Sequence, residues 1–269
     1  MTEMTGATPL LEARNLRKAF IVSGAAWENT QGRTQAVDGV SFEILRGETF
    51  GIVGESGCGK TTLARMILRL IEPDSGEIRF AGEDWLAARG TQMRAFRRRM
   101  QIVFQDPMAS LDPRMRVEAI VGEPLEIYEP RLARPARRAR IAETLEAVGL
   151  DAEVLRRFPH EFSGGQRQRI GIARALILRP ELIVADEPVS ALDVSIGAQI
   201  LELLEKLQRE FSLTLLLISH NLPVVAQLAS RVAVMQAGRF VETGLAAQVL
   251  SSPEHSYTQT LLAAVPHLP

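Results

Sequence analysis

Hydrophobic positions along the chain form short runs of strand type that alternate with longer stretches of helical period. Three runs are almost wholly apolar, as in strands buried on both faces of a sheet: residues 49–53, 182–185 and 213–218. Apolar residues recur at helical spacing in residues 63–70, 164–178 and 196–207. Alternating strands and helices predict an α/β fold with a parallel sheet.

Shorter patterns fill in the rest of the chain. Residues 10–20 and 37–44 alternate like strands, and the polar stretch 23–33 between them predicts a long loop. Further short strands are expected at 77–80 and 101–104, and a hairpin joins 232–236 to 240–243. The tail from residue 245 predicts a helix, a break at Pro253 and a second short helix.

Between Phe104 and about Phe162 the pattern is mostly helical, which predicts an inserted helical lobe. Four prolines are expected to break it: Pro113, Pro124, Pro130 and Pro135. Two basic runs, residues 94–99 and 131–140, are interpreted as solvated helix faces rather than sites for lipid or nucleic acid.

Residues 54–61 match the phosphate-loop pattern G-x-x-x-x-G-K-[ST], with a strand before and a helix after. Glycines let successive backbone N–H groups turn toward a phosphate chain, and Lys60 adds a charge for the β- and γ-phosphates. The Thr61 hydroxyl suits Mg²⁺. The alternative is a tight glycine turn with a surface lysine. We expect Lys60 on an open loop, and a lowered thiol pKa for Cys58 beside the helix N-terminus.

Two acids end the apolar run at 182–185. In a phosphate-loop protein Asp186 is placed to hold the Mg²⁺ shell and Glu187 to polarise an attacking water. His220 ends the next buried strand. A lone histidine there is more often structural, but the carboxyl ends of parallel strands share one crevice, which favours a role at the phosphates.

Two further positions have two interpretations each. Ser163 fits an N-cap, and with Gly164 and Gly165 it predicts either a second anion site or a plain helix cap. Phe20, at the end of the first strand, is either a base-stacking aromatic or a core side chain.

Composition narrows the class of protein. The chain has 269 residues, 46% of them hydrophobic, enough for one large α/β domain or a core with a subdomain. A net charge of −1 does not favour nucleic acid as a partner. Cys58 is the only cysteine, so no disulfide or cysteine-ligated metal can form within the chain, and a reducing setting fits. No signal segment or long apolar run is seen, so the chain is not expected to cross a membrane by itself.

The order of these motifs resembles the ATP-binding subunit of ABC transporters over almost the whole chain. The resemblance makes 54–61 the Walker A loop, Gln105 the Q-loop glutamine and 162–166 the LSGGQ signature with Phe162 in place of Leu. It also makes 183–187 Walker B with the catalytic glutamate, 190–193 the D-loop, His220 the switch histidine and Phe20 the A-loop aromatic, where Tyr is commoner.

The resemblance implies a fold and a set of site residues. The fold is α/β: a P-loop NTPase core with a mixed sheet, an N-terminal antiparallel β-subdomain and an inserted ABC α-helical subdomain. The core would comprise 1–105 and 163–245, the helical subdomain 106–162 and the tail 246–269. ATP would be bound by Phe20, Gly54, Glu55, Ser56, Gly57, Cys58, Gly59, Lys60, Thr61 and Thr62. Mg²⁺ would be bound by Thr61, Gln105 and Asp186; the catalytic residues would be Glu187, His220 and Gln105.

Within the family the chain resembles the peptide/nickel import branch, of the oligopeptide and dipeptide permease type. Four stretches carry this: the long loop before Val37, and residues 103–113, 219–222 and 255–262. The cysteine-rich iron–sulfur segment of many relatives is absent. Alternatives are a branch member that carries nickel, an opine or another small solute, a soluble ABC ATPase acting on nucleic acid or ribosomes, and a non-catalytic regulatory cassette.

The resemblance also implies partners at the cytoplasmic face of the membrane. They are a second ABC ATPase subunit, two membrane-spanning permease subunits and an extracytoplasmic solute-binding protein. From the opposite ATPase subunit, the signature residues Ser163, Gly164, Gly165 and Gln166 would close over the γ-phosphate.

Overall fold

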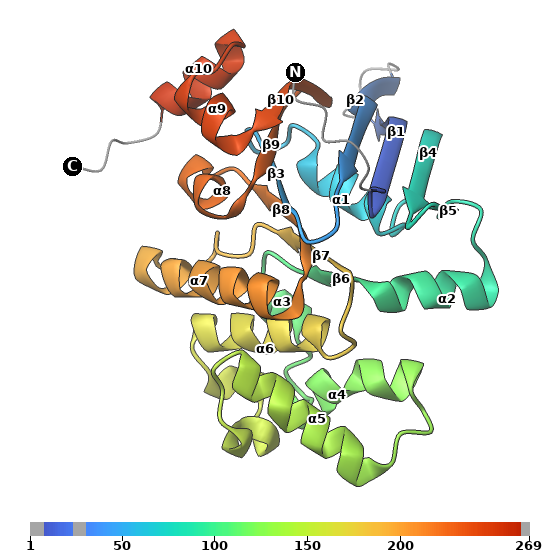
Figure 1. The fold of residues 1–269 in the computed structure, drawn as a ribbon, viewed down its shortest axis with the longest axis vertical. Coiled ribbons are helices and arrows are strands. Elements are labelled where there is room, and N and C mark those ends of the chain that lie inside the picture. The colour runs from blue at the N-terminus through green and yellow to red at the C-terminus, as the bar shows by residue number, and fades with distance from the viewer. Residues whose placement is uncertain (1–7, 24–30, 265–269) are drawn as a thin grey trace. The chain divides into compact units, whose positions relative to one another are not determined.

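The computed structural model describes residues 8–23 and 31–264 (Figure 1). The chain divides into two compact units, which are described separately. Residues 1–93 with 216–269 form the first unit, and residues 94–215 form the second. These units group the elements differently from the domains expected above, whose boundaries stay a prediction.

The first unit contains a four-stranded antiparallel sheet, which confirms the expected β-subdomain. Its order is β2-β1-β4-β5, where the strands are β1 (Leu11–Ser23), β2 (Gln31–Ile44), β4 (Ser75–Phe80) and β5 (Glu83–Asp84). In β1, bulges and a φ of 48° at Asn15 shift the buried side from Leu11 and Ala13 to Leu16.

The strands β1 and β2 run further than the hydrophobic alternation predicted, because they stay paired as far as Ser23 and Gln31. The loop expected over 23–33 is therefore shorter at both ends, and residues 24–30 lie outside the described part of the chain.

A second set of strands in the first unit is of mixed direction. Strand β9 (Arg231–Gln236) is parallel to β3 (Thr49–Val53) and antiparallel to β10 (Arg239–Leu245), and residues 216–219 of β8 (Thr214–Ser219) lie on the other side of β3. Positive φ angles at Ala237 and Gly238 form the predicted hairpin turn. The Phe42 ring of β2 contacts Phe50 of β3 and Phe240 of β10, joining the two sheets.

Within the described part of the chain, four helices belong wholly to the first unit. They are α1 (Lys60–Ile67), α8 (Leu222–Leu228), α9 (Ala246–Ser251) and α10 (Ser256–Ala263). A Cβ at Gly51 of β3 would lie 2.4 Å from Val225 of α8, so glycine lets this helix pack closely on the strand. The helices α9 and α10, with Pro253 between them, confirm the predicted form of the tail.

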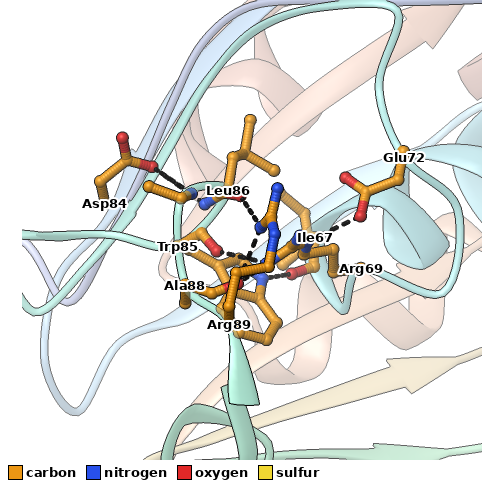
Figure 2. A network of polar contacts seen from close by, with 9 residues as sticks. Ile67, Arg69, Glu72, Asp84, Trp85, Leu86, Ala88 and Arg89 are labelled. Atoms are coloured by element: carbon orange, nitrogen blue, oxygen red, sulfur yellow. Dashed lines mark hydrogen bonds and ion pairs between the residues drawn. The ribbon is translucent and has the colours of Figure 1, made fainter. Parts of the chain in front are cut away.

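Helix α1 ends earlier than predicted, because Arg69 turns the chain with a φ of 53°. Figure 2 shows how its side chain is held: Nε donates to Glu72, and Nη1 donates to the carbonyls of Trp85 and Ala88 at 3.0 and 2.7 Å. The Trp85 indole donates in turn to the Ile67 carbonyl. Leu70, which was expected on the apolar helix face, lies beyond the helix and is 55% exposed.

The second unit has a two-stranded parallel pair covered by helices. Strands β6 (Met100–Val103) and β7 (Leu182–Asp186) pair in parallel. The helices are α3 (Pro107–Ser110), α4 (Val117–Tyr128), α5 (Arg134–Ala147), α6 (Gly164–Leu176) and α7 (Val194–Phe211), with 3₁₀ turns η1 (Ala152–Arg156) and η2 (Pro159–Glu161). Helix α2 (Gly90–Arg99) crosses the boundary of the two units.

The predicted helical lobe is present as α3 to η2, with one correction. Pro124 lies inside α4 and does not end it, because the flanking Val121 and Leu125 are fully buried and keep the helix in place. Pro135 falls in the first turn of α5, where its missing N–H costs no hydrogen bond. Among the described residues, no helix has the length and apolar character needed to span a membrane.

The two basic runs lie on helices, as predicted. In α2 the side chains of Arg94, Arg97 and Arg98 are exposed while Phe96 is buried. In α5 Arg137 forms an ion pair with Glu126 of α4, and Arg140 forms one with Glu129, the residue that follows α4. Both runs are therefore solvent-facing or paired with neighbouring carboxylates.

Candidate functional site

The phosphate loop, residues 54–61, joins β3 to α1 in the first unit. Gly54, Gly57 and Gly59 have φ angles of 154°, 82° and 114°, which side chains rarely allow. A Cβ at Gly54 would lie 2.2 Å from the Met235 carbonyl oxygen, and one at Gly59 would lie 2.1 Å from that of Ala36. Both backbone conformation and close packing therefore require glycine in this loop.

Lys60 is buried, which corrects the expectation of an open loop. Its side chain is 4% exposed, and Nζ donates to the carbonyls of Gly54 at 2.7 Å and Glu55 at 2.8 Å. The ammonium group thus lies inside the curve of its own loop. The alternative interpretation, a glycine turn with a surface lysine, is wrong.

Cys58 is half-buried, and its pKa moves opposite to the prediction. Burial raises the pKa of the Cys58 thiol above its ordinary value, and the nearby Lys60 ammonium offsets only part of that rise. The helix N-terminus does not outweigh the loss of water around the sulfur.

The loop is held from outside at two points of the first unit. The Gly238 N–H, in the β9–β10 turn, donates to the Cys58 carbonyl at 2.9 Å. The Glu55 N–H donates to the hydroxyl of Tyr257 on α10 at 3.2 Å. Sequence reasoning missed Tyr257 as a site residue, because nothing local indicates a contact across 202 positions.

The remaining predicted residues of the first unit lie as follows. Thr61 and Thr62 are in the first turn of α1 and half-buried. Phe20 lies within β1, not at its end, and is 39% exposed with the Lys18 ammonium 5.9 Å from its ring centre, which excludes the core interpretation. His220 follows β8 and is exposed. Base stacking by Phe20 and a catalytic role for His220 stay predictions.

In the second unit, the paired strands β6 and β7 bring two predicted residues together. Asp186 ends β7 and is 7% exposed, and Glu187 follows with a φ of 48° that turns its side chain out of the strand direction. Gln105, two residues after β6, donates from Nε2 to Glu187 Oε2 at 3.0 Å. The structure therefore holds the glutamate and the glutamine in direct contact.

The signature turn, residues 162–166, opens α6 of the same unit. The Ser163 hydroxyl accepts the Gln166 N–H, and the Gln166 side chain accepts the Ser163 N–H, which makes a complete capping box. A Cβ at Gly164 would lie 3.1 Å from Leu192, and one at Gly165 would lie 2.4 Å from Ile196. The predicted N-cap is confirmed, and the anion-binding alternative stays open.

Each unit offers a different chemistry. The phosphate loop collects a cation, backbone N–H groups and a helix N-terminus, which suits a polyanion. Asp186 and Glu187 offer carboxylates, of which one is buried and one accepts from Gln105. Among the described residues, no group of three or more His, Cys, Asp or Glu side chains could hold a metal ion by itself.

Comparison with known proteins gives consistent relatives. The family model described as "ABC transporter" matches residues 37–190. The oligopeptide transport ATP-binding protein OppF of Salmonella typhimurium is 49% identical over 259 residues, covering 96% of this chain and 78% of that protein. The dipeptide transport ATP-binding protein DppF of Haemophilus influenzae is 47% identical over 266 residues, covering 99% of this chain and 81% of that protein.

Solved structures share the fold. The ATP-binding cassette MJ0796, in a dimeric post-hydrolysis state bound to ADP and Pi, aligns with a TM-score of 0.76 at 28% identity, covering 88% of this chain and 98% of that one. The protein cbiO1 of Clostridium perfringens, part of the ABC transporter complex cbiONQ, aligns with a TM-score of 0.77 at 27% identity, covering 91% of this chain and 92% of that one.

Proposed function

Since the chain belongs to the ABC transporter family as an ATP-hydrolysing cassette, we propose that it couples ATP hydrolysis to the import of peptides. The observation that carries the nucleotide part is the phosphate loop, in which Lys60 lies inside a curve of backbone that only glycines can form. The relatives described as oligopeptide and dipeptide transport proteins favour peptide over nickel, an opine or another solute.

In the proposal ATP binds at the phosphate loop. The fit is supported by Lys60, whose ammonium group already has two oxygen acceptors there and can exchange them for phosphate oxygens. The proposed ligands of Mg²⁺ are Thr61, Gln105 and Asp186, whose side chains carry oxygens of the kind that Mg²⁺ prefers. When bound, Mg²⁺ would neutralise charge on the phosphates. Thr62, Ser56 and the exposed ring of Phe20 would complete the nucleotide contacts.

Glu187 is the proposed base that takes a proton from the attacking water. Its positive φ and its hydrogen bond from Gln105 orient the carboxylate. Through this bond, Gln105 would link the position of Glu187 to the helical segment that follows Gln105. His220 would contact the γ-phosphate. A general base needs a partner that orients it, and the Gln105 amide is that partner.

A complete assembly would contain a second cassette. Ser163, Gly164, Gly165 and Gln166 of that subunit would supply the γ-phosphate contacts in trans. The dimeric state of the MJ0796 structures supports this arrangement. Two permease subunits, an extracytoplasmic solute-binding protein and a position at the cytoplasmic face of the membrane follow from the importer proposal.

The test of the hydrolytic role is Glu187→Gln in the assembled transporter. The change keeps the size and one carbonyl oxygen but removes the basicity, so ATP turnover should fall by about 10²–10⁴-fold while ATP still binds. Glu202→Gln, at an exposed position on α7, is the matched control and should turn over ATP normally. Turnover near wild type in Glu187→Gln would exclude Glu187 as the base, and loss of ATP binding would make it a structural or Mg²⁺-binding residue.

The transported class needs a separate test. Peptides of two to five residues, nickel and an opine are compared for stimulation of ATP turnover by the transporter reconstituted with its solute-binding protein. Stimulation by peptides alone is expected. Stimulation by nickel or the opine without peptide would overturn the peptide proposal and leave the ATPase role intact.

A further inference from the structure

Tyr257 lies on α10, 202 positions from its partner in the phosphate loop, yet its hydroxyl accepts the Glu55 N–H at 3.2 Å. Burial raises the pKa of the Tyr257 hydroxyl, so the group stays protonated and neutral at ordinary pH. The contact therefore joins the tail of the chain to the first turn of the loop within one unit.

The peptide group between Gly54 and Glu55 is held from two sides. Its carbonyl, on Gly54, accepts from Lys60 Nζ at 2.7 Å, and its N–H, on Glu55, donates to Tyr257. A peptide group is planar, so fixing both its oxygen and its nitrogen fixes its orientation. Of the two side chains that make these contacts, Lys60 is proposed to bind phosphate and Tyr257 is not.

The tyrosine is itself positioned by hydrogen bonds at the start of α10. The Glu242 carboxylate, on β10, accepts the N–H groups of Glu254 at 2.9 Å and His255 at 3.1 Å. The imidazole Nδ1 of His255 accepts the Tyr257 N–H at 3.2 Å, which caps the helix. Thr258, the next residue, is completely buried. In Figure 1 the red helices α9 and α10 continue from the β9–β10 hairpin. These contacts fix the start of α10 and thereby position the Tyr257 hydroxyl.

We propose that Tyr257 is a positioning residue for ATP binding: it holds the Gly54–Glu55 peptide group in place when Lys60 leaves the Gly54 carbonyl for the phosphates. The proposal rests on the phosphate loop being the ATP site. The hydrogen bond of Tyr257 is to the loop backbone and does not involve Lys60, so it can persist when Lys60 turns to the phosphates. Loss of the Tyr257 hydroxyl should therefore lower the affinity for ATP and leave the rate of the chemical step unchanged.

The experiment compares Tyr257→Phe with Tyr128→Phe in the full chain. The chain has two tyrosines, so Tyr128 on α4 of the other unit is the matched control for loss of a phenolic hydroxyl. Two measurements are made: ATP turnover, which gives KM and kcat, and the rate at which a maleimide labels Cys58 without nucleotide. Cys58 is the only cysteine and lies in the loop, so its labelling reports the loop directly.

In Tyr257→Phe the KM for ATP should rise about 2- to 12-fold, the range expected for one lost hydrogen bond, with kcat within about twofold of wild type. Labelling of Cys58 should accelerate by a similar factor, because a loosened loop exposes the half-buried thiol. Tyr128→Phe should leave both quantities unchanged. A loss in kcat without a change in KM would overturn the proposal, and so would unchanged labelling of Cys58. Either result would show that the Tyr257 hydroxyl does not hold the loop for ATP binding.

Failure of the ATP site itself gives a different result. If ATP did not slow Cys58 labelling in the wild-type chain, the nucleotide role of the loop would be wrong. The labelling rates measured without ATP would still decide whether the Tyr257 hydroxyl holds the loop, because that readout needs no nucleotide.

Discussion

The phosphate loop and the signature turn both lead into a helix through glycines, but they need those glycines for different reasons. In the loop, Gly54 and Gly59 have positive φ angles and face backbone carbonyls at 2.1–2.2 Å from where a Cβ would be. In the turn, a Cβ at Gly165 would meet the side chain of Ile196 and not backbone. Where a Cβ would clash with backbone, no other residue can replace the glycine. Where it would clash with a side chain, a smaller residue at that neighbouring position can relieve the clash.

The two regions also differ in how their polar groups are satisfied. The signature turn is closed by a reciprocal pair, Ser163 and Gln166, that local sequence alone specifies. The phosphate loop is closed by Lys60 within the loop and by Gly238 and Tyr257 from distant parts of the chain. Local pattern therefore suffices for the turn and falls short for the loop.

The largest effect that would test this comparison is expected from Gly59→Ala. The substituent would need a φ of 114° and would lie 2.1 Å from the Ala36 carbonyl oxygen, so ATP binding should be lost and the free energy of unfolding should fall by more than about 2 kcal/mol. Gly82→Ala is the control, because Gly82 has a φ of 81° with open space around it. ATP titration and urea unfolding measure the two effects. Equal losses in both variants would show that φ strain, and not the close carbonyl, restricts Gly59.

A smaller and reversible effect is expected from Gly165→Ala. Overpacking against Ile196 should cost about 1–3 kcal/mol of unfolding free energy, and Ile196→Ala in the same chain should recover most of it. Gly171→Ala, in the same helix with nothing within 4 Å, should be neutral or slightly stabilising. Urea unfolding of the wild type, Gly165→Ala, Ile196→Ala and the double variant completes the cycle. If Ile196→Ala recovered none of the unfolding free energy, the Ile196 side chain would not be what restricts Gly165. The contrast between the signature turn and the phosphate loop would then be wrong.

The smallest effect concerns the pH dependence of Cys58 labelling. The thiolate is the reactive form, and burial raises the thiol pKa, so the rate in the folded chain should keep rising with pH after the rate in the urea-unfolded chain has levelled off. Near neutral pH the folded chain should therefore label more slowly. Rates measured from pH 6 to 10 in both states give the two midpoints. A lower midpoint in the folded chain would restore the original expectation that the helix N-terminus dominates.

Sequence pattern predicted the elements whose causes are local. The strand before the loop, the helix after it and the N-cap at Ser163 follow from apolar runs and short-range hydrogen bonds. The family was also readable from the order of the motifs, and comparison confirms the family. Roles for the individual site residues stay predictions.

The errors come from contacts that the side-chain pattern does not show. Leu70 was placed on the helix because spacing alone cannot show that Arg69 bonds to carbonyls 16 and 19 residues later. Lys60 was expected in solvent because its acceptors are backbone oxygens, which no side-chain pattern reveals. Pro124 was expected to end α4, but burial of its neighbours outweighs one missing hydrogen bond.

The turn at Arg69 has a consequence for how this position can change by mutation. Its φ of 53° favours glycine, which would relieve a backbone cost of about 1–2 kcal/mol. Glycine would at the same time remove the bonds to Glu72, Trp85 and Ala88, each worth about 1 kcal/mol. It would also leave the Trp85 and Ala88 carbonyls without this donor. Few substitutions are therefore expected to be tolerated at position 69. Glycine fits the backbone best, but it removes the hydrogen bonds that connect the end of α1 to the segment leading to α2.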